Sequence, residues 1–168
     1  TTDKDGREQI IYICQAGELL GYHALISQEN FKDSAALIED ATISFIPRED
    51  FLFALKSSSV LSNRLLKCLS HEFGVLTQSI SIFVHKTVRE RLALSLLILR
   101  DKYKKESIKG TPVELNLTRE DLAKVVGTAR ETLVRLLKEF KQDGLIKING
   151  RKIILINPKE LSRIANLY

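Results

Sequence analysis

The chain has 168 residues, of which 44% are hydrophobic and 28% charged, and its formal net charge is +5. This composition is that of a soluble globular protein with one or two small domains. No run approaches the roughly 18 uncharged apolar residues of a membrane span, and the first residues contain no apolar signal core. Cys14 and Cys68 lack metal-type spacing, so we expect a cytoplasmic protein without a bound metal.

The charge is unevenly distributed along the chain. Residues 1–85 carry 7 Lys and Arg against 11 Asp and Glu, whereas residues 86–168 carry 19 against 10. A basic half joined to an acidic half indicates a polyanionic partner for the basic half alone. Chance placement of surface lysines is the alternative.

The first 46 residues have a β-type pattern. Asp5-Gly6 indicates a hairpin turn, and apolar runs predict strands over 10–13, 35–38 and 42–46. After Pro47 the pattern becomes helical, with a short helix predicted over 49–55 and an N-cap for the next helix within Ser57-Ser58-Ser59.

A long apolar stripe follows. Hydrophobic side chains recur at steps of three and four over about six turns: Leu61, Leu65, Leu69, Phe73, Leu76, Ile80 and Phe83. A helix of this length cannot bury both sides inside a small domain, so the stripe predicts pairing with a second copy. Packing against the chain's own β portion is the alternative, and different faces can serve both purposes.

A helix break is expected at 85–87. Thr87 and Glu90 have the spacing of a capping box, which starts a new helix that runs to about Lys104. A polar loop over 102–110 and a short strand over 112–117 are predicted next.

Two further Thr-x-x-acid boxes lie close together. Thr118 opens a short helix through Val126, Gly127 supplies a turn, and Thr128 precedes a second helix over 129–142. Two short helices joined by a glycine turn are typical of a helix-turn-helix. Its shared core is expected to contain small and branched apolar residues: Leu122, Ala123, Val126, Leu133 and Leu136.

The second helix has a charged face that predicts base recognition. Arg130 and Arg135 can each donate two hydrogen bonds to guanine, Glu131 can accept from cytosine, and Val134 can touch a thymine methyl group. Alternatively, Glu131 serves only as a capping acid, Val134 is an indifferent surface residue, and Arg135 and Lys138 form a solvated face.

A β-hairpin is predicted after Gly144. The apolar runs 145–148 and 153–156 flank an Asn149-Gly150 turn, which is followed by Arg151 and Lys152. Beside a helix-turn-helix such a hairpin is a wing, and its basic tip is expected to contact phosphates, which supply salt-dependent affinity without sequence information.

The segments 117–123 and 127–137, with the run Arg130-Glu131-Thr132-x-x-Arg135, closely resemble the Crp/Fnr superfamily of bacterial regulators. The segments 15–21, 46–51 and 88–93 resemble it as well, so the likeness covers essentially the whole chain. It implies an α+β fold: residues 1–56 form part of a β-roll sensor of the cyclic-nucleotide-binding type, 57–85 a dimerisation helix and 86–168 a winged helix-turn-helix. About 60 residues of the β-roll are expected to be absent before residue 1.

The resemblance also implies the partners and the contact residues. It implies homodimers on palindromic double-stranded DNA resembling TGTGA–N6–TCACA, with RNA polymerase as a further partner. Arg130, Glu131 and Arg135 match base-reading positions. Residues at or beside phosphate contacts are Thr118, Arg119, Glu120 and Thr132, to which we add Lys138 from the helix face. Ala129 stands where many members have Ser, so the resemblance does not carry over the phosphate hydrogen bond of that serine.

The sensor departs from the cyclic-AMP-binding pattern. The expected effector pocket contains Gly21, Tyr22, Lys32 and Ser34, where such members carry a Glu and an Arg-Ser or Arg-Thr pair. Asp33 would repel a cyclic phosphate, so we predict no cyclic nucleotide and leave any other effector open. Two separated cysteines also disfavour an iron–sulfur cluster.

The sequence therefore predicts a transcription regulator that binds DNA as a homodimer, with the break at 85–87 as a hinge between states of different DNA affinity. One alternative is a winged-helix docking module, against which the charged face of the second helix argues. The other is an enzyme using the scattered residues His23, His71, His85, Cys14 and Cys68, which lack the sequence context of a catalytic site.

Overall fold

A computed structural model of the chain describes residues 1, 6, 8–104 and 112–167, without the side chains of residues 79, 81 and 83. The chain divides into two compact units. One unit contains residues 1–20, 32–38 and 86–168, and the other contains residues 21–31 and 39–85. The three-part division expected from the sequence stays a prediction.

The regular secondary structure in the described part of the unit of residues 21–31 and 39–85 is helical. It contains α1 (Tyr22–Ser27), α2 (Arg48–Ser57) and α3 (Ser59–His85). Ser58 lies between α2 and α3, and its hydroxyl accepts a hydrogen bond from the Leu61 amide at 3.2 Å, which confirms a serine cap. The core of the unit is small and joins all three helices through Tyr22, Phe51 and Leu65.

The apolar stripe of α3 divides into two parts. Leu65 is buried against Tyr22 and Phe51, and Leu69 packs partly against the same cluster. Further along the helix, Phe73 is 69% exposed, and Leu76 and Ile80 are also exposed. The first part is thus already used inside the chain, but against two helices and not against the expected β portion, while Phe73, Leu76 and Ile80 of the second part stay exposed. The side chain of Phe83 lies outside the described residues.

The strands expected in the first 46 residues do not form. Residues 10–13, 35–38 and 42–46 have no regular secondary structure, and a helix that the sequence pattern did not indicate occupies Tyr22–Ser27. A strand needs a neighbouring strand to take up its backbone hydrogen bonds. Among the described residues, none of these segments pairs with such a neighbour. The Ile10 amide donates instead to the Lys124 carbonyl at 3.3 Å.

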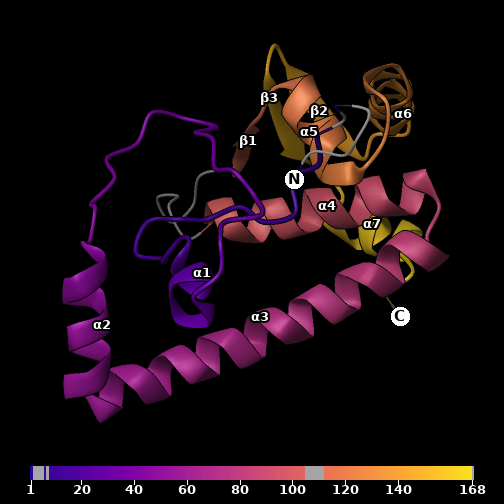
Figure 1. Cartoon of the computed structure of the whole chain (residues 1–168). Helices are drawn as coiled ribbons and strands as arrows, with labels where there is room; N and C mark the ends of the chain where they lie inside the picture. Colours follow the sequence, from indigo (N-terminus) through magenta and orange to yellow (C-terminus); the bar gives the residue numbers. More distant parts are fainter. Residues whose placement is uncertain (2–5, 7, 105–111, 168) are drawn as a thin grey trace. The chain divides into compact units, whose positions relative to one another are not determined.

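The other unit holds a helix-rich domain with a small sheet (Figure 1). Its elements in chain order are α4 (Val88–Lys104), β1 (Glu114–Asn116), α5 (Arg119–Val126), α6 (Arg130–Gln142), β2 (Ile146–Asn149), β3 (Lys152–Leu155) and α7 (Pro158–Ile164). The sheet is antiparallel in the order β1-β3-β2, and Ile148 pairs with Ile153. The start of the predicted loop, 102–104, belongs to α4, and the rest of it, 105–110, lies outside the described residues.

Local sequence explains where these helices begin. At α4 the Thr87 amide donates to the Glu90 carboxylate at 2.7 Å and the Glu90 amide donates to the Thr87 hydroxyl at 3.3 Å, which confirms the capping box. These bonds, first from the hydroxyl and then from the amide of Thr87, lower the pKa of Glu90. At α7, Asn157 caps the helix and Pro158 follows at the first position.

The core of this domain lies between α4 and the elements that follow it. It includes side chains with no more than 2% exposure from α4, α5, α6 and β3: Leu92, Leu96, Leu99, Leu122, Leu133, Phe140 and Ile153. α4 also packs against α7 (Figure 1). The core therefore fixes α5, α6 and the β2–β3 hairpin on one framework.

Candidate nucleic-acid interface

The turn between α5 and α6 is tight and well bonded. Thr118 caps α5 by accepting from the Asp121 amide at 2.9 Å. Gly127 has φ 68°, a left-handed conformation that a side chain disfavours, and both its amide and that of Thr128 donate to the Ala123 carbonyl. Ala123 is 4% exposed, as expected of a small residue where two helices approach. The predicted helix-turn-helix is therefore present.

The start of α6 differs from the expected capping box. The N-cap is Ala129 rather than Thr128, and no side chain caps the helix. The Thr128 amide donates to the Ala123 carbonyl, so it is not available for the bond to the Glu131 carboxylate that a capping box at Thr128 requires. Glu131 consequently lies at the second helical position and is not a capping acid. The first amides of α6 have no side-chain acceptor, which is the arrangement that binds phosphates at helix N-termini.

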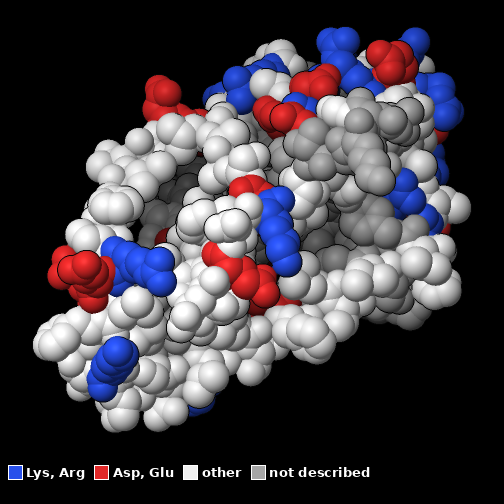
Figure 2. Space-filling model, in the orientation of Figure 1, with Lys and Arg blue, Asp and Glu red and all other residues white. Residues whose placement is uncertain are grey.

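One face of α6 is buried and the opposite face is open. Leu133, Leu136, Leu137 and Phe140 pack into the core. The opposite face borders a shallow hollow of about 450 Å³, lined by Arg130, Glu131, Val134, Arg135 and Lys138. These five residues are those of the predicted reading face. Figure 2 shows Lys and Arg side chains gathered over this part of the molecule, with acidic groups among them.

Arg135 is the reading-face residue with a defined partner. Its guanidinium donates to Glu139, one turn later, at 2.9 Å and remains 66% exposed. Arg130 and Glu131 are exposed, and within the described part of the chain their side chains form no hydrogen bond or ion pair. Val134 is 46% exposed between these charges. The face therefore offers donors, an acceptor and an apolar contact to an external ligand.

A second hollow of about 220 Å³ lies between α6 and the hairpin. Its lining includes Lys138 and Arg119, which were predicted to contact phosphates, and also Lys141, which was not predicted. Lys141 lies three residues after Lys138, so the helical spacing could have indicated it. Three cations around one hollow form a suitable binding surface for a phosphate backbone.

The wing hairpin turns one residue later than expected. Asn149 pairs with Lys152, so the two turn residues are Gly150 and Arg151 rather than Asn149 and Gly150. Gly150 has φ 55°. A glycine at the first turn position is typical of type II′ hairpins and explains why the asparagine joins the strand.

Arg119 holds this turn from α5. Its guanidinium donates to the carbonyls of Gly150 at 2.9 Å and Arg151 at 3.0 Å. Partial burial lowers the pKa of Arg119, yet an arginine stays protonated at neutral pH. The phosphate role predicted for Arg119 stays a prediction, and its observed contact is with the wing.

The other predicted phosphate residues also have internal contacts. Arg151 donates to the Ile38 carbonyl at 3.3 Å, and the Lys152 ammonium lies 2.5 Å from the Glu114 carboxylate. Glu120 lies 3.9 Å from Lys124, and Thr132 is half-buried. All remain on or near the surface, and their phosphate contacts stay predictions.

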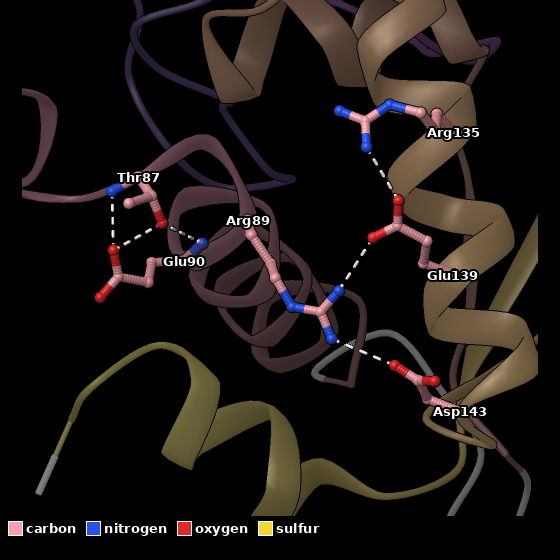
Figure 3. Close-up of polar contacts among 6 residues, drawn as sticks. All are labelled: Thr87, Arg89, Glu90, Arg135, Glu139 and Asp143. Carbon is pink, nitrogen blue, oxygen red and sulfur yellow. Dashed lines mark hydrogen bonds and ion pairs between the residues drawn. The ribbon is translucent and has the colours of Figure 1, made fainter.

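Two arginines at the start of α4 attach it to the helix-turn-helix. Arg91 donates to the carbonyls of Val126 and Gly127 at 3.0 and 3.1 Å. Arg89 forms ion pairs with Glu139 at 3.0 Å and Asp143 at 3.1 Å and lies over the Phe140 ring. Figure 3 shows Arg89 reaching from α4 to Glu139 on α6 and to Asp143 at the end of that helix. Sequence reasoning missed these pairs because their members are 35 to 54 residues apart.

The residues of the predicted effector pocket fall in both compact units. Gly21 and Tyr22 belong to the unit of residues 21–31 and 39–85, and Lys32 and Ser34 belong to the other. Tyr22 is 5% exposed and serves as a core residue. The effector site therefore stays a prediction. In the part of the chain that the structure describes, no helix combines the length and apolarity needed to span a membrane.

Comparisons with known proteins agree with this architecture. The model of the Crp-like helix-turn-helix domain matches residues 90–164, and that of the cyclic nucleotide-binding domain matches residues 1–58. The electron transport regulator A of Shewanella oneidensis is 26% identical over 98% of the chain and 66% of its own length. The fumarate and nitrate reduction regulatory protein of Vibrio cholerae is 26% identical over 99% and 66%.

A solved structure of a Crp/Fnr-family transcriptional regulator from Eubacterium rectale is 28% identical, with a TM-score of 0.54 over 72% of the chain and 53% of that protein. The chain spans slightly less than two thirds of the length of the curated relatives just named. Because the models of both domains match and the solved structure just named is described as a member of the Crp/Fnr family, the chain belongs to the Crp/Fnr superfamily.

Proposed function

We propose that this protein is a transcription regulator that binds a palindromic double-stranded DNA site as a homodimer and reads it with α6. The observation that carries the proposal is the exposed face of α6, where Arg130, Glu131 and Arg135 project from a helix whose other face is buried. An open, charged face at the start of the second helix is the geometry that enters a major groove.

The chemistry of this face suits base edges. Arg130 and Arg135 can each give two hydrogen bonds to O6 and N7 of guanine, and Glu131 can accept from N4 of cytosine. Arg130 and Glu131 have no competing partner among the described residues, so no internal bond has to break when they bind. Val134 lies between them and offers an apolar contact for a thymine methyl group.

The flanking cations suit the DNA backbone. Lys138 and Lys141 border the hollow beside the hairpin, and Arg151 occupies its turn. The uncapped start of α6 adds backbone amides for a further phosphate. These contacts release counterions from the DNA. The affinity that they supply therefore falls as the salt concentration rises.

The exposed part of the α3 stripe supports the homodimer. Phe73, Leu76 and Ile80 are all at least 50% exposed on one helix. An apolar helix face of this kind is typically covered by a copy of itself, which brings two recognition helices to half-sites one helical turn apart, about 34 Å. Leu65 adds little to this surface because it is buried within the chain.

The capped start of α4 serves as the hinge, and RNA polymerase is the further partner through which such a dimer would act on transcription. We also propose that DNA binding is independent of cyclic nucleotides, since Asp33 stands in the region where a cyclic phosphate would need a cation.

Selection from a random double-stranded DNA library, using the full chain without an added effector, tests the proposal. We expect a two-fold palindrome with half-sites about 10 base pairs apart between centres. Sedimentation of the complex should give two chains per duplex. Enrichment of no sequence, or binding that does not weaken between 50 and 200 mM salt, roughly the range over which phosphate contacts lose affinity, would contradict it.

A further inference from the structure

Glu139 connects the base-reading face to α4. One carboxylate oxygen accepts from the Arg135 guanidinium at 2.9 Å, and the other accepts from Arg89 at 3.0 Å (Figure 3). Arg89 is fixed in turn by Asp143 at 3.1 Å and by the Phe140 ring, whose centroid lies 4.9 Å from its guanidinium carbon. The result is a chain of alternating charges from the first turn of α4 to the reading face.

The members of this chain differ in how firmly they are held. Arg135 is 66% exposed, whereas Glu139 and Arg89 are 35% and 38% exposed. Among the described residues, Arg89 contacts Glu139, Asp143 and Phe140, Glu139 pairs with both arginines, and Arg135 pairs with Glu139. Arg89 therefore restrains Glu139, and Glu139 restrains Arg135. In the protein without DNA, the Arg135 side chain has already lost part of its rotamer freedom.

The bond to Glu139 leaves Arg135 able to bind a base. A guanidinium has five N–H groups, and the Glu139 bond uses the Nη1 nitrogen. The remaining donors include those that guanine O6 and N7 require. Glu139 and guanine can therefore hold the same side chain at once, and the acid does not have to be displaced.

We propose that Glu139 is a positioning residue for Arg135 and that Arg89 positions Glu139, so that α4 sets the orientation of the base-reading arginine. This inference rests on the proposed function and adds two specificity-determining residues that do not themselves touch DNA. Arg89 stands two residues after the cap residue Thr87, so the chain of contacts begins at the expected hinge.

The direction in which Glu139→Ala changes DNA affinity distinguishes positioning of Arg135 from a simple charge effect. Removing an acid near DNA lowers repulsion and would tighten binding to every sequence. Positioning predicts the reverse on the selected site. Glu139→Ala should weaken binding there about two- to tenfold, because Arg135 must then be immobilised on binding. Binding to a random duplex should stay equal or become tighter.

A double-mutant cycle provides the decisive experiment. Dissociation constants are measured for the full chain on its selected palindrome, with Glu139→Ala, Arg135→Ala and both together. We expect Glu139→Ala to weaken binding when Arg135 is present and to leave binding equal or slightly tighter in the Arg135→Ala background, where only the charge effect remains. Arg89→Ala should likewise weaken binding when Arg135 is present, and Glu139→Gln, which keeps an acceptor oxygen, should retain part of the affinity.

Arg163→Ala serves as the matched control, since Arg163 forms an exposed ion pair with Glu160 on α7 at 3.3 Å and lies outside the reading face. It should leave affinity unchanged. Thermal unfolding of each variant separates lost binding from lost folding. The inference would be overturned if Glu139→Ala lowered the affinity equally with and without Arg135, or if it tightened binding to the selected site. The proposed function would stand in either case. Failure of the parent chain to select any sequence would overturn both.

Discussion

Replacing Arg119 should loosen the wing without unfolding the domain. Its guanidinium donates to the carbonyls of Gly150 and Arg151 at 2.9 and 3.0 Å. A hydrogen bond with a charged donor contributes about 1.5–3 kcal/mol when buried. Because this site is partly exposed, we assign the pair together about 1.5 kcal/mol, or roughly a tenfold change in the opening equilibrium of the hairpin.

The measurement is amide hydrogen exchange of the DNA-free protein. Arg119→Ala should speed exchange of the β2–β3 amides about tenfold, while the amides of α4 keep the parent rate. Arg119→Lys keeps the charge but not the forked geometry, so it should restore only part of the protection. Parent-like exchange in Arg119→Ala would show that Arg119 does not hold the wing, and a salt dependence of DNA binding reduced by about one phosphate would then favour a direct phosphate contact.

Three other substitutions test separate parts of the structure. Phe73→Glu should convert a dimer to monomers in sedimentation, whereas Phe53→Glu, a control at an equally exposed phenylalanine of α2, should leave it dimeric. Phe140→Ala should lower the free energy of unfolding in urea by about 3–5 kcal/mol, since the ring is fully buried, and a loss below about 1 kcal/mol would contradict its place in the core. The lowered pKa of Glu90 means that its capping contribution is present at neutral pH and is lost as the pH falls below about 4.3. Glu90→Gln should therefore reduce the fall in the free energy of unfolding at acid pH. An unchanged fall would show that the capping box does not stabilise α4.

The sequence predicted the winged helix-turn-helix well because its elements are determined locally. Thr87, Thr118 and Gly127 mark helix boundaries through bonds to residues three or four positions away. The alternation of apolar and charged residues likewise separates the buried face of α6 from its reading face. The Asn157, Pro158 and Glu160 pattern of α7 has the same local character and could have been used.

Features that depend on distant partners could not be predicted in this way. The strands expected over 10–13, 35–38 and 42–46 needed neighbours to pair with, and apolar alternation does not say whether they exist. The contact between Arg89 and Glu139 spans 50 residues, and that between Arg119 and the wing spans 31 or 32. Leu65 had the spacing of a dimer residue, yet Tyr22 and Phe51 bury it within the chain.

The N-cap of α6 was predicted one residue too early. Thr128 and Ala129 both precede the helix, and composition favours the threonine. The end of α5 takes up the Thr128 amide, which a capping box at Thr128 would need, and the observed cap is Ala129. Competition between two adjacent helix ends is therefore resolved by the turn that joins them.

The claim that α6 reads bases is tested most directly by comparing the sequence preferences of the parent chain, Arg135→Ala and Arg151→Ala on a library randomised within each half-site. The account predicts that Arg135→Ala loses preference at one base pair per half-site, at a cost of about 1–3 kcal/mol, while Arg151→Ala binds all sequences more weakly with an unchanged preference. A parent-like preference in Arg135→Ala would contradict the assignment of α6 as the recognition helix.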